Sequence, residues 1–111
     1  MYIITGGSGL LGNAFKKILP NSLYPSSKYL DLEDSNQTHG FFDSFNVISV
    51  PKIDTVIHLA GKVGGVKSNT QYIADFYHAN SQINNNVITS CVYTGVPKLV
   101  CCLSTCIYPD E

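Results

Sequence analysis

The residues best suited to chemistry stand near the end of the sequence, in the segment LSTCIYPDE at residues 103–111. Ser104 and Cys106 are two positions apart, so on an extended strand their side chains point the same way. A hydroxyl can hydrogen-bond a carbonyl oxygen, and a thiol beside a cation can exchange protons near neutral pH. This pair therefore indicates an acid/base site. The alternatives are a strand-end cap at Ser104 and a buried packing cysteine at Cys106, which is also our interpretation of Cys101 and Cys102.

A glycine-rich turn, TGGSGLLG at residues 5–12, offers a second kind of chemistry. Between a strand and a helix, the first glycine of such a turn permits the bend, the second admits a pyrophosphate, and the third allows close packing of the helix. The phosphates of a dinucleotide would meet free N–H groups at the helix start. The alternative is a glycine-rich turn without a ligand. We predict that a dinucleotide contacts Gly6, Ser8, Gly9, Leu10, Leu11 and Gly12.

The end of the next extended segment, LYPSSK, indicates which dinucleotide binds. NAD sites usually carry Asp or Glu there to hold the ribose 2′-hydroxyl. Ser26, Ser27 and Lys28 instead supply hydrogen-bond donors and a positive charge, which suit a 2′-phosphate. The sequence therefore favours NADP over NAD, and the alternative is an ordinary solvated loop. We expect Asp31 and Leu32 beside the adenine, with a helix-start acid as the alternative for Asp31.

The elements that position these residues alternate between strand and helix. Short apolar runs predict strands, and apolar residues spaced by three and four predict helices. The run DTVIHLA is too apolar to have a wet face, which is typical of a strand in a parallel sheet. We predict strands at Tyr2–Thr5, Ser22–Pro25, Asp54–Ala60 and Lys98–Leu103, a small edge strand at Tyr29–Asp31, and helices at Leu10–Leu19, Ser35–Val47 and Gln71–Thr94.

This order predicts an α/β fold, a Rossmann-type doubly wound parallel sheet in three layers. Ligands of such sheets bind at the carboxyl ends of the strands, where TGGSG, AGKVGG and STC all lie. The inward side chains should be Leu10, Leu11, Ala14, Phe15, Ile18 and Leu19 on the first helix, Phe41, Phe42 and Phe45 on the second, and Ile73, Phe76, Tyr77, Ile83, Val87, Ile88 and Cys91 on the third.

Four segments together resemble the GDP-L-fucose synthase family, within the extended short-chain dehydrogenase/reductase superfamily: the glycine turn, HLAGKVGGV, the run from Asn69 to Phe76, and LSTCIYPD. The resemblance implies NADP-dependent conversion of GDP-4-keto-6-deoxy-D-mannose to GDP-L-fucose, by two epimerisations and a hydride transfer. It implies that Ser104 binds the keto oxygen and that Cys106 is the acid/base of epimerisation. It also implies cofactor contacts at Leu59, Ala60 and Gly61, and sugar contacts at Gly64, Gly65 and Asn69, for which a flexible turn is the alternative.

Part of the family's site is missing from the sequence. The superfamily's general acid is a Tyr followed four residues later by a Lys, one helical turn away. Tyr24 and Lys28 have this spacing, but Pro25 lies between them and no helix would bring their side chains together. The true pair and the sugar-binding lobe should lie beyond Glu111, because the family's proteins are much longer. The resemblance therefore implies that residues 1–111 are the N-terminal portion of an NAD(P)-binding domain, with an incomplete sheet, and we expect this fragment to be inactive alone.

Charge and cysteine content exclude several other functions. Seven Lys+Arg against eight Asp+Glu give a net charge of −1 with no basic stripe, which argues against nucleic acid or a membrane surface as partner. No apolar run is long enough for a membrane span and no signal peptide is present, so we expect a cytoplasmic protein. The four cysteines form no C-x-x-C pair, which predicts free thiols and no metal site.

Two rival functions stay open. The chain could belong to another extended short-chain sugar-nucleotide epimerase or dehydratase, against which Cys106 and the KVGG segment argue. It could also be a non-catalytic dinucleotide-binding regulatory module. We further expect His58 to be structural, because it sits inside an apolar strand, and we expect the helix at 71–94 to contribute to a homodimer of the full-length protein.

Overall fold

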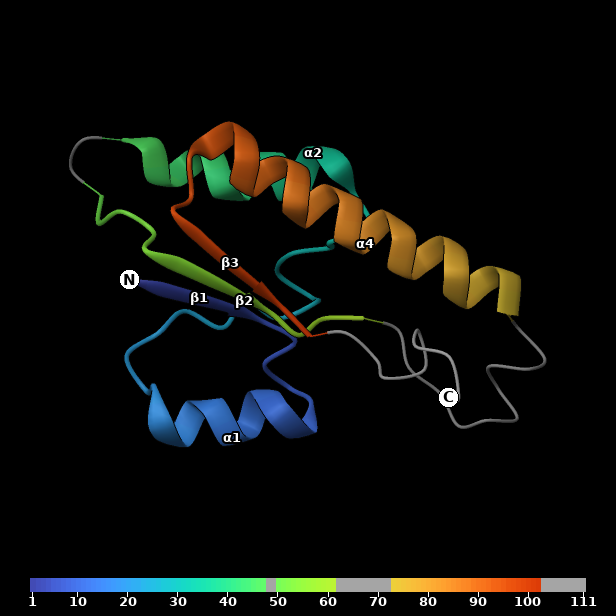
Figure 1. Cartoon of the computed structure of the whole chain (residues 1–111), viewed down its shortest axis with the longest axis horizontal. Helices are drawn as coiled ribbons and strands as arrows, with labels where there is room; N and C mark the ends of the chain where they lie inside the picture. Colours follow the sequence, from blue (N-terminus) through green and yellow to red (C-terminus); the bar gives the residue numbers. More distant parts are fainter. Residues whose placement is uncertain (48–49, 62–72, 103–111) are drawn as a thin grey trace, which may run out of the picture.

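A computed structural model of the chain describes residues 1–47, 50–61 and 73–102. Three parallel strands form its sheet in the order β1 (Tyr2–Thr5), β2 (Thr55–His58) and β3 (Lys98–Cys101), as Figure 1 shows. The last residues of the strands face one another, because Thr5 pairs with His58 and His58 pairs with Cys101. The three carboxyl ends therefore meet at one edge of the sheet, as the sequence predicts.

The strand predicted at Ser22–Pro25 is present only as an isolated parallel bridge, in which Leu23 pairs with Ile3 of β1. Its N–H donates to the Tyr2 carbonyl at 2.9 Å, and its carbonyl accepts from the Ile4 N–H at 2.9 Å. These bonds use the edge of β1 that does not face β2. Leu23 thus lies along one edge of β1, and β2 pairs with the other edge. The connections after β1 therefore go in opposite directions along the sheet, and the position between β1 and β2 is the topological switch point.

The predicted edge strand at Tyr29–Asp31 is wrong. The backbone turns there instead, because the N–H groups of Tyr29 and Leu30 both donate to the Ser26 carbonyl, at 3.0 and 2.8 Å. These local bonds satisfy donors that a strand would have offered to a neighbour. Pro25 precedes the turn and has no N–H to give to a sheet.

Helices cover both faces of the sheet, which confirms the three-layer α/β prediction (Figure 1). One face carries α1 (Leu10–Ile18), and the other carries α2 (Ser35–Asp43), the short 3₁₀ turn η1 (Ser44–Asn46) and α4 (Ile73–Thr94). The predicted start of the last helix at Gln71 lies outside the described residues, as does the predicted strand end at Leu103.

The ends of α2 and α4 have local causes in the sequence. Asp34 caps α2, since its Oδ1 accepts a hydrogen bond from the Gln37 N–H at 3.1 Å. Gly95 follows α4 with a φ of +73°, and the next N–H, of Val96, bonds back to the Cys91 carbonyl at 3.0 Å. Such a left-handed glycine is a common helix C-terminus.

The core lies between the sheet and the α2–α4 layer, and consists of Ile3, Phe42, Ile53, Val56, Val87 and Cys91. The predicted inward positions Phe42, Ile83, Val87 and Cys91 are confirmed, and Phe41 and Phe45 pack half-buried against this core. Tyr77 and Ile88 were expected inward but are exposed. The buried face of α4 consists of Ala79, Ile83, Val87 and Ser90, and these two side chains lie outside that face. The side chains of Ile73 and Phe76 lie outside the description.

The predicted burial of the α1 stripe is wrong for most of its members. Leu10 is 92% exposed, Leu11 54% and Ile18 73%, Ala14 is exposed as well, and Phe15 and Leu19 are half-buried. The sheet beneath α1 is nevertheless closed, because Ile4 and Ile57 are buried. In the part of the chain that the structure describes, α1 alone covers this face, and nothing packs on its outer side.

The cysteines of β3 also differ from the prediction. Cys101 and Cys102 are exposed rather than packed, because β3 is the edge strand and its outer side has no described neighbour. Cys91 is buried in the core, and burial raises the pKa of its thiol to about 11. All three are free thiols, as predicted. No described helix has the length and apolarity that a bilayer crossing requires.

Candidate functional site

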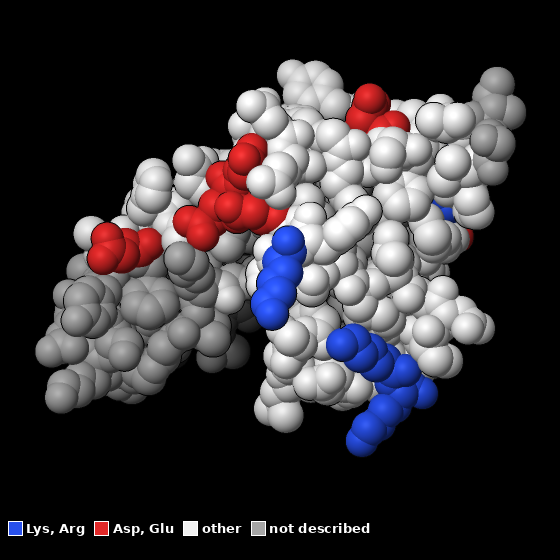
Figure 2. Space-filling view, turned by 180° about the vertical axis from the view of Figure 1, so that it is seen from behind, with Lys and Arg blue, Asp and Glu red and all other residues white. Residues whose placement is uncertain are grey.

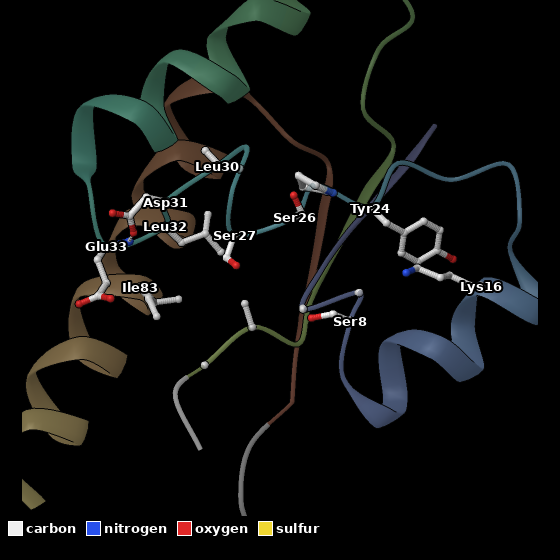
Figure 3. Close-up of a pocket in the computed structure, with 15 residues that line it drawn as sticks. Ser8, Lys16, Tyr24, Ser26, Ser27, Leu30, Asp31, Leu32, Glu33 and Ile83 are labelled. Carbon is white, nitrogen blue, oxygen red and sulfur yellow. Dashed lines mark hydrogen bonds between the residues drawn. The ribbon is translucent and has the colours of Figure 1, made fainter. Parts of the chain in front are cut away.

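A cleft of about 310 Å³ opens at the carboxyl ends of β1 and β2, at the topological switch point. Figure 3 shows three groups of side chains around it. Lys16 and Tyr24 stand on one side, Ser8, Ser26 and Ser27 lie in the middle, and Leu30, Asp31, Leu32, Glu33 and Ile83 stand on the other side. Backbone of the glycine turn and of Ala60–Gly61 completes the wall. The cleft is at the lower end of the size range of small-molecule sites.

Two glycines of the turn are required by the protein's own packing. Gly6 has a φ of +74°, and a Cβ built there would lie 2.7 Å from the Ala60 nitrogen. A Cβ on Gly12 would lie 2.3 Å from the Gly6 carbonyl oxygen and 2.5 Å from the Gly7 Cα. Each is a backbone atom that cannot move aside like a side chain. The turn, α1 and the loop after β2 are therefore in direct backbone contact.

Gly9 has a different environment from Gly6 and Gly12. A Cβ on Gly9 would meet only the Gly6 carbonyl oxygen, at an ordinary 3.5 Å. Internal packing thus does not explain a glycine at this position. The predicted close approach of a pyrophosphate does explain it, because a phosphate at the helix start needs the space that a Cβ would fill.

The start of α1 is electropositive and open. Gly9 is the N-cap, so no side chain satisfies the first N–H groups, and no acidic residue lies in the first turn to offset the helix dipole. The Ser8 carbonyl is occupied by the Asn13 side chain at 3.2 Å. The donor set is therefore backbone N–H groups with a partial positive charge, which fits the phosphates of a dinucleotide.

A buried hydrogen-bond chain holds the loop after β2 against this turn. Thr5 Oγ1 accepts from the N–H groups of Leu59 and Ala60, each at 3.1 Å. Its own proton must then go to His58 Nδ1, at 2.7 Å, so Nδ1 carries no proton. The other ring nitrogen, Nε2, donates to Asn84 Oδ1 at 2.9 Å. Burial lowers the pKa of His58, against a smaller opposing effect of Asn84, and keeps the ring neutral.

On one side of the cleft, formed by the loop at residues 30–33 and by Ile83 of α4, hydrogen bonds fix the backbone of the loop. Asn86, buried on α4, donates to the Leu32 carbonyl at 2.8 Å. Asp31 Oδ1 accepts from the Glu33 N–H at 3.0 Å, and the Asp31 N–H donates to Gln37 Oε1 at 3.1 Å. Leu32 and Ile83 face the cleft above this backbone, which suits a flat ring such as adenine.

The charges of the cleft are separated. Lys16 is the cation among the described lining residues, and the carboxylates of Asp31 and Glu33 lie on the opposite side (Figure 3). On the face shown in Figure 2, acidic side chains gather at the upper left with a basic side chain beside them at the centre, while Lys16 and Lys17 belong to α1. Lys28, the cation predicted from the sequence, is not among the described residues that line the cleft.

The predicted cofactor residues fall into two groups. Those on the cleft wall are Gly6, Ser8, Ser27, Asp31, Leu32, Ala60 and Gly61. Those that are described but are not among its lining residues are Gly9, Leu10, Leu11, Gly12, Lys28 and Leu59. The predicted residues Gly64, Gly65, Asn69, Ser104 and Cys106 lie outside the described part, so their roles stay predictions.

The lining residues that sequence reasoning missed are Gly7, Lys16, Tyr24, Pro25, Leu30, Glu33 and Ile83. A signal for Lys16 existed, because it follows Gly12 by four residues and so lies on the same side of α1 as the glycine contact. The described residues contain no cluster of His, Cys, Asp or Glu that could hold a metal ion.

Comparisons with known proteins agree with this geometry. A family model described as the NAD dependent epimerase/dehydratase family matches residues 2–111. A GDP-L-fucose synthase from Dictyostelium discoideum is 37% identical over 116 residues, covering 98% of this chain and 34% of the relative. The chain thus spans about a third of the length of the curated relatives it matches.

Solved structures give the same relation. A GDP-L-fucose synthetase from Naegleria fowleri bound to NADP superposes with a TM-score of 0.79 at 34% identity, over 99% of this chain and 33% of that one. A GDP-D-glycero-L-gluco-heptose synthase from Campylobacter jejuni, solved in the presence of NADPH, gives 0.86 at 28% identity, over 99% and 32%. Both likenesses extend over nearly the whole chain.

Proposed function

The chain belongs to the NAD dependent epimerase/dehydratase family, and from this membership we propose that it forms the cofactor-binding part of an NADP-dependent GDP-sugar epimerase/reductase. We propose GDP-4-keto-6-deoxy-D-mannose as substrate and GDP-L-fucose as product. The observation that carries the proposal is the cleft at the switch point, whose wall includes Gly6, Gly7 and Ser8, just before the uncapped N-terminus of α1, together with hydroxyls and apolar side chains.

The described residues would hold the adenosine half of NADP. The turn Gly6–Gly12 would bind the pyrophosphate through backbone N–H groups, and Leu32 with Ile83 would pack on the adenine. The Thr5–His58–Asn84 chain would keep Leu59 and Ala60 against the turn, so that the cleft is formed before the ligand arrives. The bound cofactor supplies a hydride to the sugar ketone.

The sugar chemistry would use residues just after β3, which lie outside the description. In our proposal Ser104 donates a hydrogen bond to the keto oxygen, which stabilises the negative charge that develops there during deprotonation of the neighbouring carbon. Cys106 accepts or returns the carbon-bound proton on one face of the ring. Gly64, Gly65 and Asn69 would contact the cofactor and sugar.

The direct test uses Cys106→Ser in the complete protein that contains this sequence. Deuterium incorporation from heavy water into the keto-sugar measures proton exchange, and NADPH oxidation measures hydride transfer. We expect deuterium incorporation to fall about 100-fold or more, while NADPH oxidation continues and yields the reduced sugar that has not been epimerised.

Serine at position 106 keeps a small polar side chain but loses the acidic thiol, so it isolates the proton transfer. Cys102→Ser is the matched control, because Cys102 is exposed and our proposal gives it no role. Unchanged deuterium incorporation in the Cys106 variant would return this residue to a packing role. Absence of both activities in the unmodified protein would overturn the proposed function.

A second candidate is a GDP-sugar epimerase/reductase that acts on another hexose or heptose. The Campylobacter jejuni heptose synthase favours it, because its TM-score of 0.86 exceeds the 0.79 of the Naegleria fowleri enzyme. Its lower identity, 28% against 34%, points the other way. Parallel assays with the corresponding keto-sugars distinguish the two, since the true substrate should have the higher kcat/KM.

We also propose a cytoplasmic homodimer. Free thiols at Cys91, Cys101 and Cys102 are typical of a reducing compartment. Tyr77 and Val92 are apolar side chains exposed on α4, which supports α4 as the dimer interface. A monomeric mass of the complete protein by sedimentation would contradict the dimer.

A further inference from the structure

We propose that Lys16, and not Lys28, is the cation that recognises the 2′-phosphate of NADP, and that the Tyr24 ring holds Lys16 in position. This inference rests on the proposed function, because it assumes that the dinucleotide lies in the cleft. It goes further by assigning the preference for NADP over NAD to one side chain that contacts the phosphate and one residue that positions it.

The first support is the way in which Lys16 is held. Its Nζ lies over the Tyr24 ring, 5.5 Å from the ring centroid, a cation–π contact. The ring is itself fixed, because the Tyr24 hydroxyl donates to the Leu19 carbonyl at 2.7 Å. An ammonium group that is already oriented loses less conformational entropy when it binds an anion.

The second support is the contact between Lys16 and the phosphate-binding turn. A Cβ built on Gly7 would lie 3.4 Å from Lys16 Cε and 3.1 Å from the Cβ of Tyr24. The lysine stem therefore lies beside the glycine turn, next to the N–H groups that would bind the pyrophosphate. A 2′-phosphate on the same nucleotide is within one ribose of that pyrophosphate, so both anionic groups would lie close to Lys16.

The third support is the charge of the rest of the cleft. The sequence has seven Lys+Arg residues, and all seven are lysine. Among the described ones, Lys16 lines the cleft and Lys28 does not. Asp31 and Glu33 on the opposite side would repel a phosphate, whereas Ser26 and Ser27 in the middle can donate to it. A doubly charged phosphate is therefore directed to the Lys16 side.

The test compares dissociation constants for NADPH and NADH in the complete protein. Lys16→Gln should weaken NADPH binding roughly 10- to 100-fold, the usual range for the loss of a charged hydrogen bond. NADH, which lacks the 2′-phosphate, should change less than about threefold. Lys16→Arg should restore most of the preference, because it retains the charge.

Two further variants check specificity and positioning. Lys17→Gln is the matched control, since Lys17 lies on the same turn of α1 but not among the described residues of the cleft wall, and both affinities should be unchanged. Tyr24→Leu removes the ring and should lower NADPH affinity in the same direction as Lys16→Gln but by less, with NADH unaffected. Equal thermal unfolding of all variants excludes a folding defect.

The possible failures are distinguishable. If the unmodified protein binds neither nucleotide, the proposed function fails and this inference with it. If it binds both and Lys16→Gln weakens NADPH and NADH equally, the dinucleotide site stands but Lys16 does not recognise the 2′-phosphate. A selective loss of NADPH in Lys28→Gln, with no change in Lys16→Gln, would assign the role to Lys28 and overturn the inference.

Discussion

Gly6 and Gly12 connect the sequence most directly to the site, because each removes a side chain from a backbone contact. Their spacing in the sequence predicts the turn, and the structure gives the distances that make it necessary. The spacing from Gly12 places Lys16 on the side of α1 that carries the glycine contact, but the contact between Lys16 and Tyr24 could not be predicted in the same way. Their contact depends on the rotation of α1 relative to the segment after Leu23, and residue spacing along the chain does not determine that rotation.

At the residue scale, Gly12→Ala should destabilise the protein, because the new Cβ would lie 2.3 Å from the Gly6 carbonyl oxygen. We expect a loss of about 1–3 kcal/mol in the free energy of unfolding, as for other overpacked sites, together with weaker NADPH binding. Urea denaturation and a binding titration measure the two effects.

Gly40→Ala is the matched control for this experiment. Gly40 lies within α2, and a Cβ there would have nothing within 4 Å. Alanine should therefore stabilise the protein by about 0.5–1 kcal/mol through helix propensity alone. If Gly12→Ala proved as stabilising as Gly40→Ala, the backbone contact between α1 and the turn would not exist as described.

At the scale of elements, a hydrogen-bond chain joins β1, β2 and α4 through Thr5, His58 and Asn84. The sequence predicts a structural His58, because a histidine inside an apolar strand must find buried partners. It does not identify those partners, which are 53 and 26 residues away along the chain. The turn at Tyr29–Asp31 is a similar case, since hydrogen bonds to Ser26 overrode the local apolar pattern.

His58 should make stability depend on pH with a defined sign. Burial lowers its pKa from the ordinary 6.5, so the unfolded chain takes up the proton more readily. The contribution is fully present above that value and is lost as the pH falls from about 6.5 toward the folded-state pKa, with a slope of at most about 1.4 kcal/mol per pH unit.

The measurement is an NMR titration of the His58 imidazole, with urea denaturation between about pH 5 and 7.5. His78→Gln is the control, because His78 is exposed on α4 and is not part of this hydrogen-bond chain, so its replacement should leave the titration of His58 unchanged. A His58 pKa at or above 6.5 in the folded protein would show that the ring is not held neutral by burial and by its two hydrogen bonds, to Thr5 and Asn84.

At the scale of the whole molecule, the strand–helix order predicts the parallel three-layer architecture, and the structure confirms it. The strand content of residues 22–25 and the burial of Leu10, Leu11 and Ile18 could not be predicted from local patterns. An apolar stripe indicates which side of a helix could be buried. Burial also requires another element that packs against that side, and the local sequence pattern does not show whether one is present. The edge position of β3 exposes Cys101 for the same reason.

The central claim is that a dinucleotide lies on the open amides after β1, and amide chemical shifts of the ¹⁵N-labelled chain during addition of NADPH test it most directly. The account predicts shift changes at Gly6–Gly12, with further changes at Ser26, Ser27, Ala60 and Gly61. Unchanged shifts at the turn, with changes confined to the opposite end of the sheet near Lys52 and Lys98, would contradict it.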